Sequence, residues 1–180
     1  MSKNIVVVIG SPRENGNTEI LSDAFIKGAK SNDNTVTKIN LSKLKISDCV
    51  DCKYCSTHDG ECAQRDGMDE VYPALRKADM IVFASPIYFY GFTAQMKAVI
   101  DRLIVSFAKN FPITSCALLT VYEDTDTTVC EPIIAHYRAV TGLLRWEDKG
   151  IIAVSGVGAK GAINCHDSLV QAEQLGTSIK

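Results

Sequence analysis

The chain has 180 residues and a formal net charge of −2 at pH 7, and 46% of its residues are hydrophobic. A chain of this length is typical of one domain with one substantial core, so we expect a single domain over residues 1–180. The lack of a basic excess argues against nucleic acid or a membrane surface as a partner, and no apolar run is long enough to span a bilayer. We therefore expect a cytoplasmic protein whose partners are small molecules or other proteins.

Apolar runs and amphipathic helical patterns alternate five times along the chain, which indicates a doubly wound α/β sheet. Four of the runs are almost entirely apolar, as in strands that are covered on both faces. The second run alternates polar and apolar residues and fits an edge strand, so we predict the parallel strand order 2-1-3-4-5 with helices on both faces. The predicted strands cover residues 5–10, 36–41, 80–85, 116–121 and 151–155, and the predicted helices cover residues 18–31, 68–77, 93–107, 128–143 and 166–179.

The first predicted strand leads into the segment Gly-Ser-Pro-Arg-Glu-Asn-Gly-Asn-Thr, and a helix follows. Gly10 and Gly16 permit a tight backbone path, Ser11 and Thr18 provide hydroxyl donors, and Arg13 provides a fork of charged donors. The positive end of the following helix points at the same place. The lysine of a P-loop and the pattern Gly-x-Gly-x-x-Gly are both missing, so the segment predicts a site for a monophosphate.

A second loop, which follows the third predicted strand, contains the aromatic run Tyr88-Phe89-Tyr90 after Pro86 and Ile87. In the predicted sheet this loop faces the first one across the switch point, where ligands bind. A flat apolar ring against the aromatic loop and a phosphate on the first loop together specify FMN. The alternative, that the aromatic residues only cover the core, stays open at this point.

The motifs of the two loops, with Gln95-Met96-Lys97-Ala98 and Asp101-Arg102 further on, resemble the NADPH-dependent FMN reductase and iron-sulfur flavoprotein group of flavodoxin-like proteins. The resemblance covers most of the chain. It implies a flavodoxin-like fold and an FMN-dependent oxidoreductase that takes electrons from NAD(P)H, passes them to a small-molecule acceptor, and forms a homodimer or homotetramer.

The same resemblance implies which residues bind the cofactor. The expected FMN-binding residues are Ser11, Arg13, Asn15, Asn17, Thr18, Pro86, Ile87, Tyr88 and Phe89. No side chain is expected to act as a catalytic residue, because the flavin carries the chemistry. The chain departs from the family pattern at residues 120–126, which are acidic where many relatives are rich in glycine, and this leaves a third flavin contact undefined. Asp101 and Arg102 are expected to form an ion pair at the surface or at an interface.

Four cysteines, Cys49, Cys52, Cys55 and Cys62, lie between the second predicted strand and the second predicted helix. Their spacing resembles the compact cluster motif of iron-sulfur flavoproteins and predicts a 4Fe-4S cluster. Zinc held by the four thiolates and free or reactive thiols are the alternatives. The corresponding alternative functions are an electron carrier that works between ferredoxin-like partners through FMN and the cluster, and a thiol-based redox sensor.

Overall fold

A computed structural model describes residues 2–180 and contains a five-stranded sheet of order β2-β1-β3-β4-β5, in which all neighbouring strands are parallel. The predicted doubly wound sheet and its strand order are therefore confirmed. The strands are β1 (Asn4–Ile9), β2 (Thr35–Asn40), β3 (Met80–Pro86), β4 (Ser115–Val121) and β5 (Glu147–Val154).

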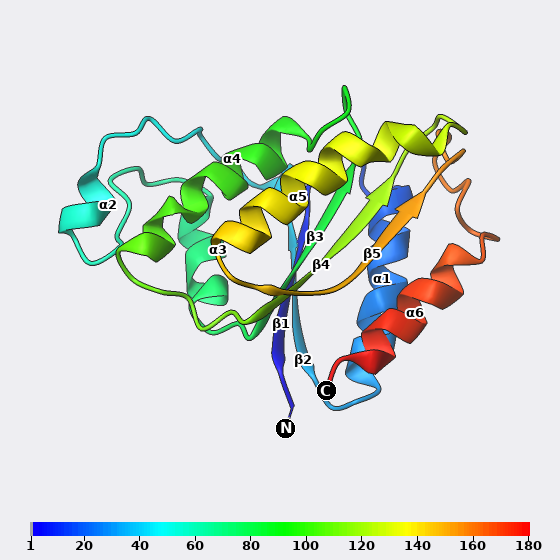
Figure 1. Ribbon diagram of the computed structural model, residues 1–180, viewed down its shortest axis with the longest axis horizontal. Coiled ribbons are helices and arrows are strands. Elements are labelled where there is room, and N and C mark those ends of the chain that lie inside the picture. Colours follow the sequence, from blue (N-terminus) through cyan, green and yellow to red (C-terminus); the bar gives the residue numbers. More distant parts are fainter. Residues whose placement is uncertain (1) are drawn as a thin grey trace.

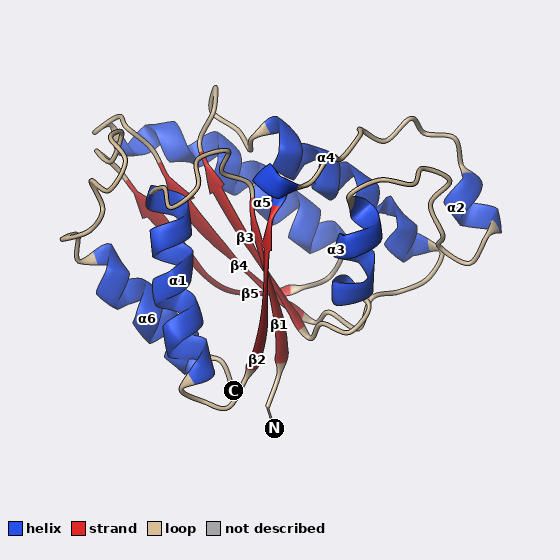
Figure 2. Ribbon diagram, turned by 180° about the vertical axis from the view of Figure 1, so that it is seen from behind, coloured by secondary structure: helices blue, strands red, loops and turns tan. Residues whose placement is uncertain are grey.

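Helices cover both faces of this sheet (Figure 1). One face packs against α1 (Asn17–Lys30) and α6 (Ser168–Ser178), and the other packs against α3 (Met68–Leu75), α4 (Ala94–Arg102) and α5 (Glu131–Leu143). Figure 2 shows the sheet between these two layers. The short helix α2 (Tyr54–Thr57) belongs to the segment of residues 44–67 that carries four cysteines, called the cysteine loop below, and lies at the opposite end of the molecule from α6 (Figure 1).

The side chains of β1 alternate between the two cores of the molecule. Ile5, Val7 and Ile9 face the core under α1 and α6, whereas Val6 and Val8 face the core under α3, α4 and α5. An apolar residue at every position is thus needed, because both faces are covered.

The structure differs from the predicted elements mainly at three places. Strand β5 begins at Glu147, before the predicted start at residue 151; its first residues are polar because β5 is an edge strand, so the apolar pattern does not include them. The predicted helix over residues 93–107 is divided into α4 and a 3-10 segment, Leu103–Phe107. The predicted helix over residues 128–143 is likewise divided, into a 3-10 segment, Thr127–Cys130, and α5. Within residues 2–180, none of the helices is long and apolar enough to cross a membrane.

Candidate functional site

The loop between β1 and α1 is held in shape by its own hydrogen bonds. The Arg13 amide donates to Ser11 Oγ (3.2 Å), and the Gly16 amide donates to the Arg13 carbonyl (3.3 Å). Asn15 adopts a left-handed conformation with φ of 51°, and its amide donates to the Glu19 carboxylate (2.6 Å). These bonds curl the loop back onto the first turn of α1.

Two glycines allow this loop to approach its neighbours closely. A Cβ atom on Gly10 would lie 2.8 Å from Met96 Cβ, and the Gly10 carbonyl accepts a hydrogen bond from Thr93 Oγ1 (2.7 Å). A Cβ atom on Gly16 would lie 3.0 Å from the Arg13 carbonyl oxygen. The path of the loop therefore requires glycine at position 10, and Gly16 allows a tight approach to the Arg13 carbonyl.

The first turn of α1 is open toward this loop. Helix α1 begins after Gly16, and no side chain of the described residues caps it. The first amides of a helix lack partners within the helix and carry its positive dipole, so they favour an anion. Two buried hydroxyl residues belong to the same region, Ser11 in the loop and Thr18 in the first turn of α1. The chemistry of this donor set fits a phosphate group.

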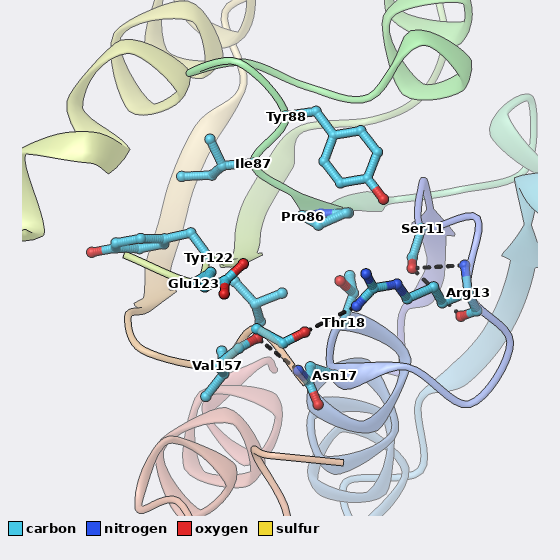
Figure 3. A pocket seen from close by; sticks show the side chains of 12 residues that line it. Ser11, Arg13, Asn17, Thr18, Pro86, Ile87, Tyr88, Tyr122, Glu123 and Val157 are labelled. Atoms are coloured by element: carbon cyan, nitrogen blue, oxygen red, sulfur yellow. Dashed lines mark hydrogen bonds between the residues drawn. The ribbon is translucent and has the colours of Figure 1, made fainter. Parts of the chain in front are cut away.

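One pocket combines this loop with the ends of β3, β4 and β5 (Figure 3). All the predicted FMN-binding residues except Asn15 and Phe89 line it. The full lining is Ser11, Arg13, Asn17, Thr18, Pro86, Ile87, Tyr88, Val121, Tyr122, Glu123, Val157 and Gly158. The pocket thus brings two segments together at the predicted switch point. One is the loop of residues 11–18, called the phosphate-type loop below, and the other is the start of the aromatic loop, Pro86, Ile87 and Tyr88.

Asn17 uses its side chain to hold the loop that follows β5. Its Nδ2 donates to the carbonyls of Val157 and Ala159 (both 2.8 Å), and its Oδ1 accepts from the Gly161 amide (2.9 Å). Arg13 Nη1 reaches the same loop and donates to the Gly158 carbonyl (2.9 Å; Figure 3). This wall of the pocket is not evident from the sequence, in which the glycines after the last strand are its one signal.

The aromatic loop forms a tight turn in which Tyr88 and Gly91 exchange backbone hydrogen bonds of 3.0 and 3.1 Å. Phe89 and Tyr90, at its centre, have φ angles of 46° and 65°. Turns of this kind usually contain Asn-Gly, because bulky residues rarely adopt positive φ. The turn directs Tyr88 into the pocket and leaves Phe89 fully exposed, at 103% of its reference accessibility.

The acidic segment after β4 also contributes to the pocket. The Glu123 side chain packs so closely on Gly158 that a Cβ atom there would lie 2.6 Å from Glu123 Cγ. Burial, together with Cys130 nearby, raises the pKa of Tyr122 to about 12, so the phenol remains protonated at neutral pH. Arg13 and Glu123 both line the pocket, so it contains one cation and one carboxylate.

The four cysteines of the predicted cluster motif lie together at a second pocket. Cys49, Cys52, Cys55 and Cys62 are all free thiols, and all four line it. Among residues 2–180, no three His, Cys, Asp or Glu side chains lie close enough to hold a single metal ion. A 4Fe-4S cluster is larger than one ion and takes one thiolate at each iron, so four cysteines around one pocket fit a cluster.

Arg102 also lines this second pocket, and its ion pair differs from the expected pair with Asp101. Arg102 does not pair with Asp101, which binds Lys97, but is buried and forms an ion pair with Asp66 (2.6 Å). Burial opposes the charge on Asp66, but amide hydrogen bonds from Ser47 and Met68 and the bond from Arg102 outweigh burial and lower its pKa. The pair is therefore charged at neutral pH.

Comparison with known proteins identifies the family. A family model described as NADPH-dependent FMN reductase matches residues 3–123. The chain belongs to this family. Solved structures of similar fold include an NAD(P)H:quinone oxidoreductase from Methanothermobacter marburgensis, with a TM-score of 0.74, 17% identity and coverage of 98% of this chain and 96% of the other. They also include an FMN-dependent NADH-azoreductase from Bacillus anthracis in complex with FMN, with a TM-score of 0.71, 12% identity and coverage of 96% and 97%.

The curated relatives of this FMN reductase family member include several iron-sulfur flavoproteins. One from Archaeoglobus fulgidus is 40% identical over 99 residues, and one from Methanosarcina thermophila is 34% identical over 109 residues. These alignments cover 55% and 61% of this chain but only 44% and 56% of the relatives, so the chain matches about half of their length. A putative NAD(P)H-dependent FMN-containing oxidoreductase, YwqN of Bacillus subtilis, is 22% identical over 95% of both chains.

Proposed function

We propose that this chain is an FMN-dependent oxidoreductase that takes electrons from NAD(P)H and passes them to a small-molecule acceptor. The observation that carries the proposal is the single pocket that joins the phosphate-type loop of residues 11–18 to Pro86, Ile87 and Tyr88. Membership of the NADPH-dependent FMN reductase family supports the same conclusion. When bound, FMN supplies hydride and one-electron chemistry, so the protein has to bind, orient and shield it.

The phosphate end of FMN is assigned to the first loop. Arg13 holds Gly158 through Nη1, which leaves the other guanidinium N–H groups able to donate to a phosphate. The hydroxyls of Ser11 and Thr18 and the uncapped first turn of α1 add neutral donors. Asn17 acts differently in this assignment, because its amide holds the opposite wall of the pocket.

The ring end is assigned to the loops after β3 and β4. Pro86, Ile87 and Tyr88 offer apolar surface to the ring. The Tyr122 hydroxyl points away from the other lining side chains (Figure 3), toward Cys130 and Ser155, so Tyr122 forms part of the wall and does not offer a donor. We expect Phe89 to contact a second copy of the chain, since this apolar side chain is fully exposed on a strained turn and packs against none of residues 2–180. A homodimer or homotetramer is accordingly part of the proposal, and light scattering coupled to gel filtration tests it.

The flavin content of the purified protein tests this proposal. The protein is denatured, the released cofactor is identified by chromatography, and NADPH and NADH oxidation are followed with a quinone as acceptor. We expect FMN in stoichiometric amount and an oxidation rate that depends on it. A protein that contains no FMN after purification and does not bind FMN added afterwards contradicts the proposal.

A second candidate function, an electron carrier between ferredoxin-like partners, is favoured by the four cysteines around one pocket. Cys49, Cys52, Cys55 and Cys62 would hold a 4Fe-4S cluster, which supplies one-electron transfer when bound. A cytoplasmic location would keep these thiols reduced. Anaerobic reconstitution with iron and sulfide tests the candidate. Stoichiometric zinc in place of iron, or no metal at all, contradicts it.

A further inference from the structure

Arg102, the last residue of α4, is almost completely buried, with 1% of its surface exposed. Its guanidinium lies over the ring of Tyr72 on α3, 5.8 Å from the centroid, and within residues 2–180 it donates four hydrogen bonds, all to the cysteine loop. Nη1 donates to Asp66 Oδ2 (2.6 Å) and to the Ser47 carbonyl (3.3 Å). Nη2 donates to Cys62 Sγ (3.3 Å) and to the Gln64 carbonyl (3.5 Å). One side chain thus ties the beginning of the loop to its end.

These contacts do not satisfy Arg102 completely. Its Nε is buried and has no hydrogen-bond partner within residues 2–180. A buried donor without a partner is costly, and such groups in native proteins usually have an acceptor. Arg102 lines the same pocket as Cys49, Cys52, Cys55 and Cys62. The pocket therefore combines four sulfur ligands with a buried cation that has a donor to spare.

We propose that Arg102 is the positioning and charge-compensating residue for an anionic, thiolate-ligated cluster held by the four cysteines. It places Cys62 through the Nη2–H···S bond, fixes both ends of the loop, and balances part of the negative charge that four thiolates bring into the pocket. The proposal rests on the second candidate function. Hydrogen bonds to the sulfur atoms and nearby charge are among the features that set the potential of such clusters.

The proposed cluster site and the proposed FMN site lie at opposite ends of α4. Thr93 caps the first turn of α4 and donates to Gly10 in the phosphate-type loop, whereas Arg102 ends the helix at the cysteine loop. A helix of this length is about 13 Å long. Changes at Arg102 can therefore be measured separately at the two sites.

The test uses Arg102→Met and Arg102→Lys, with Arg76→Met as the matched control. Arg76 also binds the cysteine loop, through the Gly60 carbonyl (3.1 Å) and Glu61 (3.0 Å), but it does not line the pocket. Each protein is reconstituted anaerobically, iron, sulfide and FMN are counted, iron retention is measured against a chelator, and the cluster potential is determined by EPR-monitored titration.

We expect Arg102→Met to hold iron roughly 10- to 100-fold more weakly than wild type and to have a lower cluster potential, since a cation and an N–H···S bond are lost. Arg102→Lys keeps the positive charge but not the bond to Cys62, so it should hold iron more weakly than wild type and have a cluster potential nearer to that of wild type. Arg76→Met should match wild type in both. Asp66→Asn removes the anion paired with Arg102 and should shift the potential in the opposite direction, upward, which a purely structural role would not do.

Four outcomes overturn the proposal. One is unchanged iron retention and potential in folded Arg102→Met, and another is equal loss in Arg76→Met. The third is a downward shift, or no shift, in Asp66→Asn. If Arg102→Met does not fold, Arg102→Lys and Asp66→Asn decide the matter alone. The fourth is a wild-type protein that binds FMN but no iron, which removes the cluster and this proposal with it and leaves the FMN oxidoreductase intact.

Discussion

Arg13→Ala tests the assignment of the phosphate end of FMN. Within residues 2–180, Nη1 is the only guanidinium nitrogen of Arg13 that has a hydrogen-bond partner, the Gly158 carbonyl, and Asn17 holds the same loop independently. The pocket should therefore keep its shape in the variant. One charge-assisted hydrogen bond to phosphate contributes about 1.5–3 kcal/mol, which corresponds to a roughly 10- to 150-fold loss of FMN affinity.

The assay is titration of FMN and of riboflavin with the protein, followed by quenching of flavin fluorescence. Riboflavin has no phosphate, so its affinity should be nearly the same in wild type and Arg13→Ala. Arg138→Ala removes an exposed arginine on α5 and controls for net charge. Equal weakening of FMN and riboflavin by Arg13→Ala would refute the assignment.

Three further predictions follow from other contacts of the first loop and the pocket. Glu123→Gln removes a carboxylate from the pocket and should tighten FMN by up to about fivefold, measured by the same quenching titration, with less effect on riboflavin; unchanged affinity would place the carboxylate away from the phosphate. Gly10→Ala forces a Cβ atom against Met96 and should lower the free energy of unfolding by about 1–3 kcal/mol in urea titrations; a stability equal to that of wild type would contradict the close approach. Burial opposes ionisation of Glu19, but hydrogen bonds from Lys38 and Asn15 and the charge of Lys38 lower its pKa below the ordinary 4.5. Ionised Glu19 thus stabilises the folded state; this contribution is complete above the ordinary pKa and is lost as the pH falls through the lowered pKa. The difference in the free energy of unfolding between wild type and Glu19→Gln should therefore vanish in acid. A difference that grows in acid would contradict the lowered pKa.

The strand order and the two principal loops could be predicted from the sequence because local patterns determine them. Apolar runs with an alternating second strand specify the sheet, and the strand ends then specify where the loops meet. The pocket combines these loops as expected, with Ser11, Arg13 and Thr18 on one side and Pro86 and Tyr88 on the other.

Contacts between residues far apart in the sequence could not be predicted in this way. Asn17 binds a carbonyl 140 residues away, and the partners of Arg102 at Asp66 and Cys62 are 36 and 40 residues away. An arginine at the end of an amphipathic helix usually reaches water, so nothing in the local pattern indicates burial. The exposure of Phe89 depends on the positive φ angles of its turn, which the aromatic sequence disfavours.

Anaerobic titration of the FMN-loaded protein with NADPH and with NADH, followed by flavin absorbance, tests the central claim most directly. The account predicts that a stoichiometric amount of at least one nicotinamide bleaches the bound flavin, and that a quinone added afterwards restores the oxidised spectrum. Bound FMN that dithionite reduces but neither nicotinamide reduces would contradict an NAD(P)H-dependent oxidoreductase.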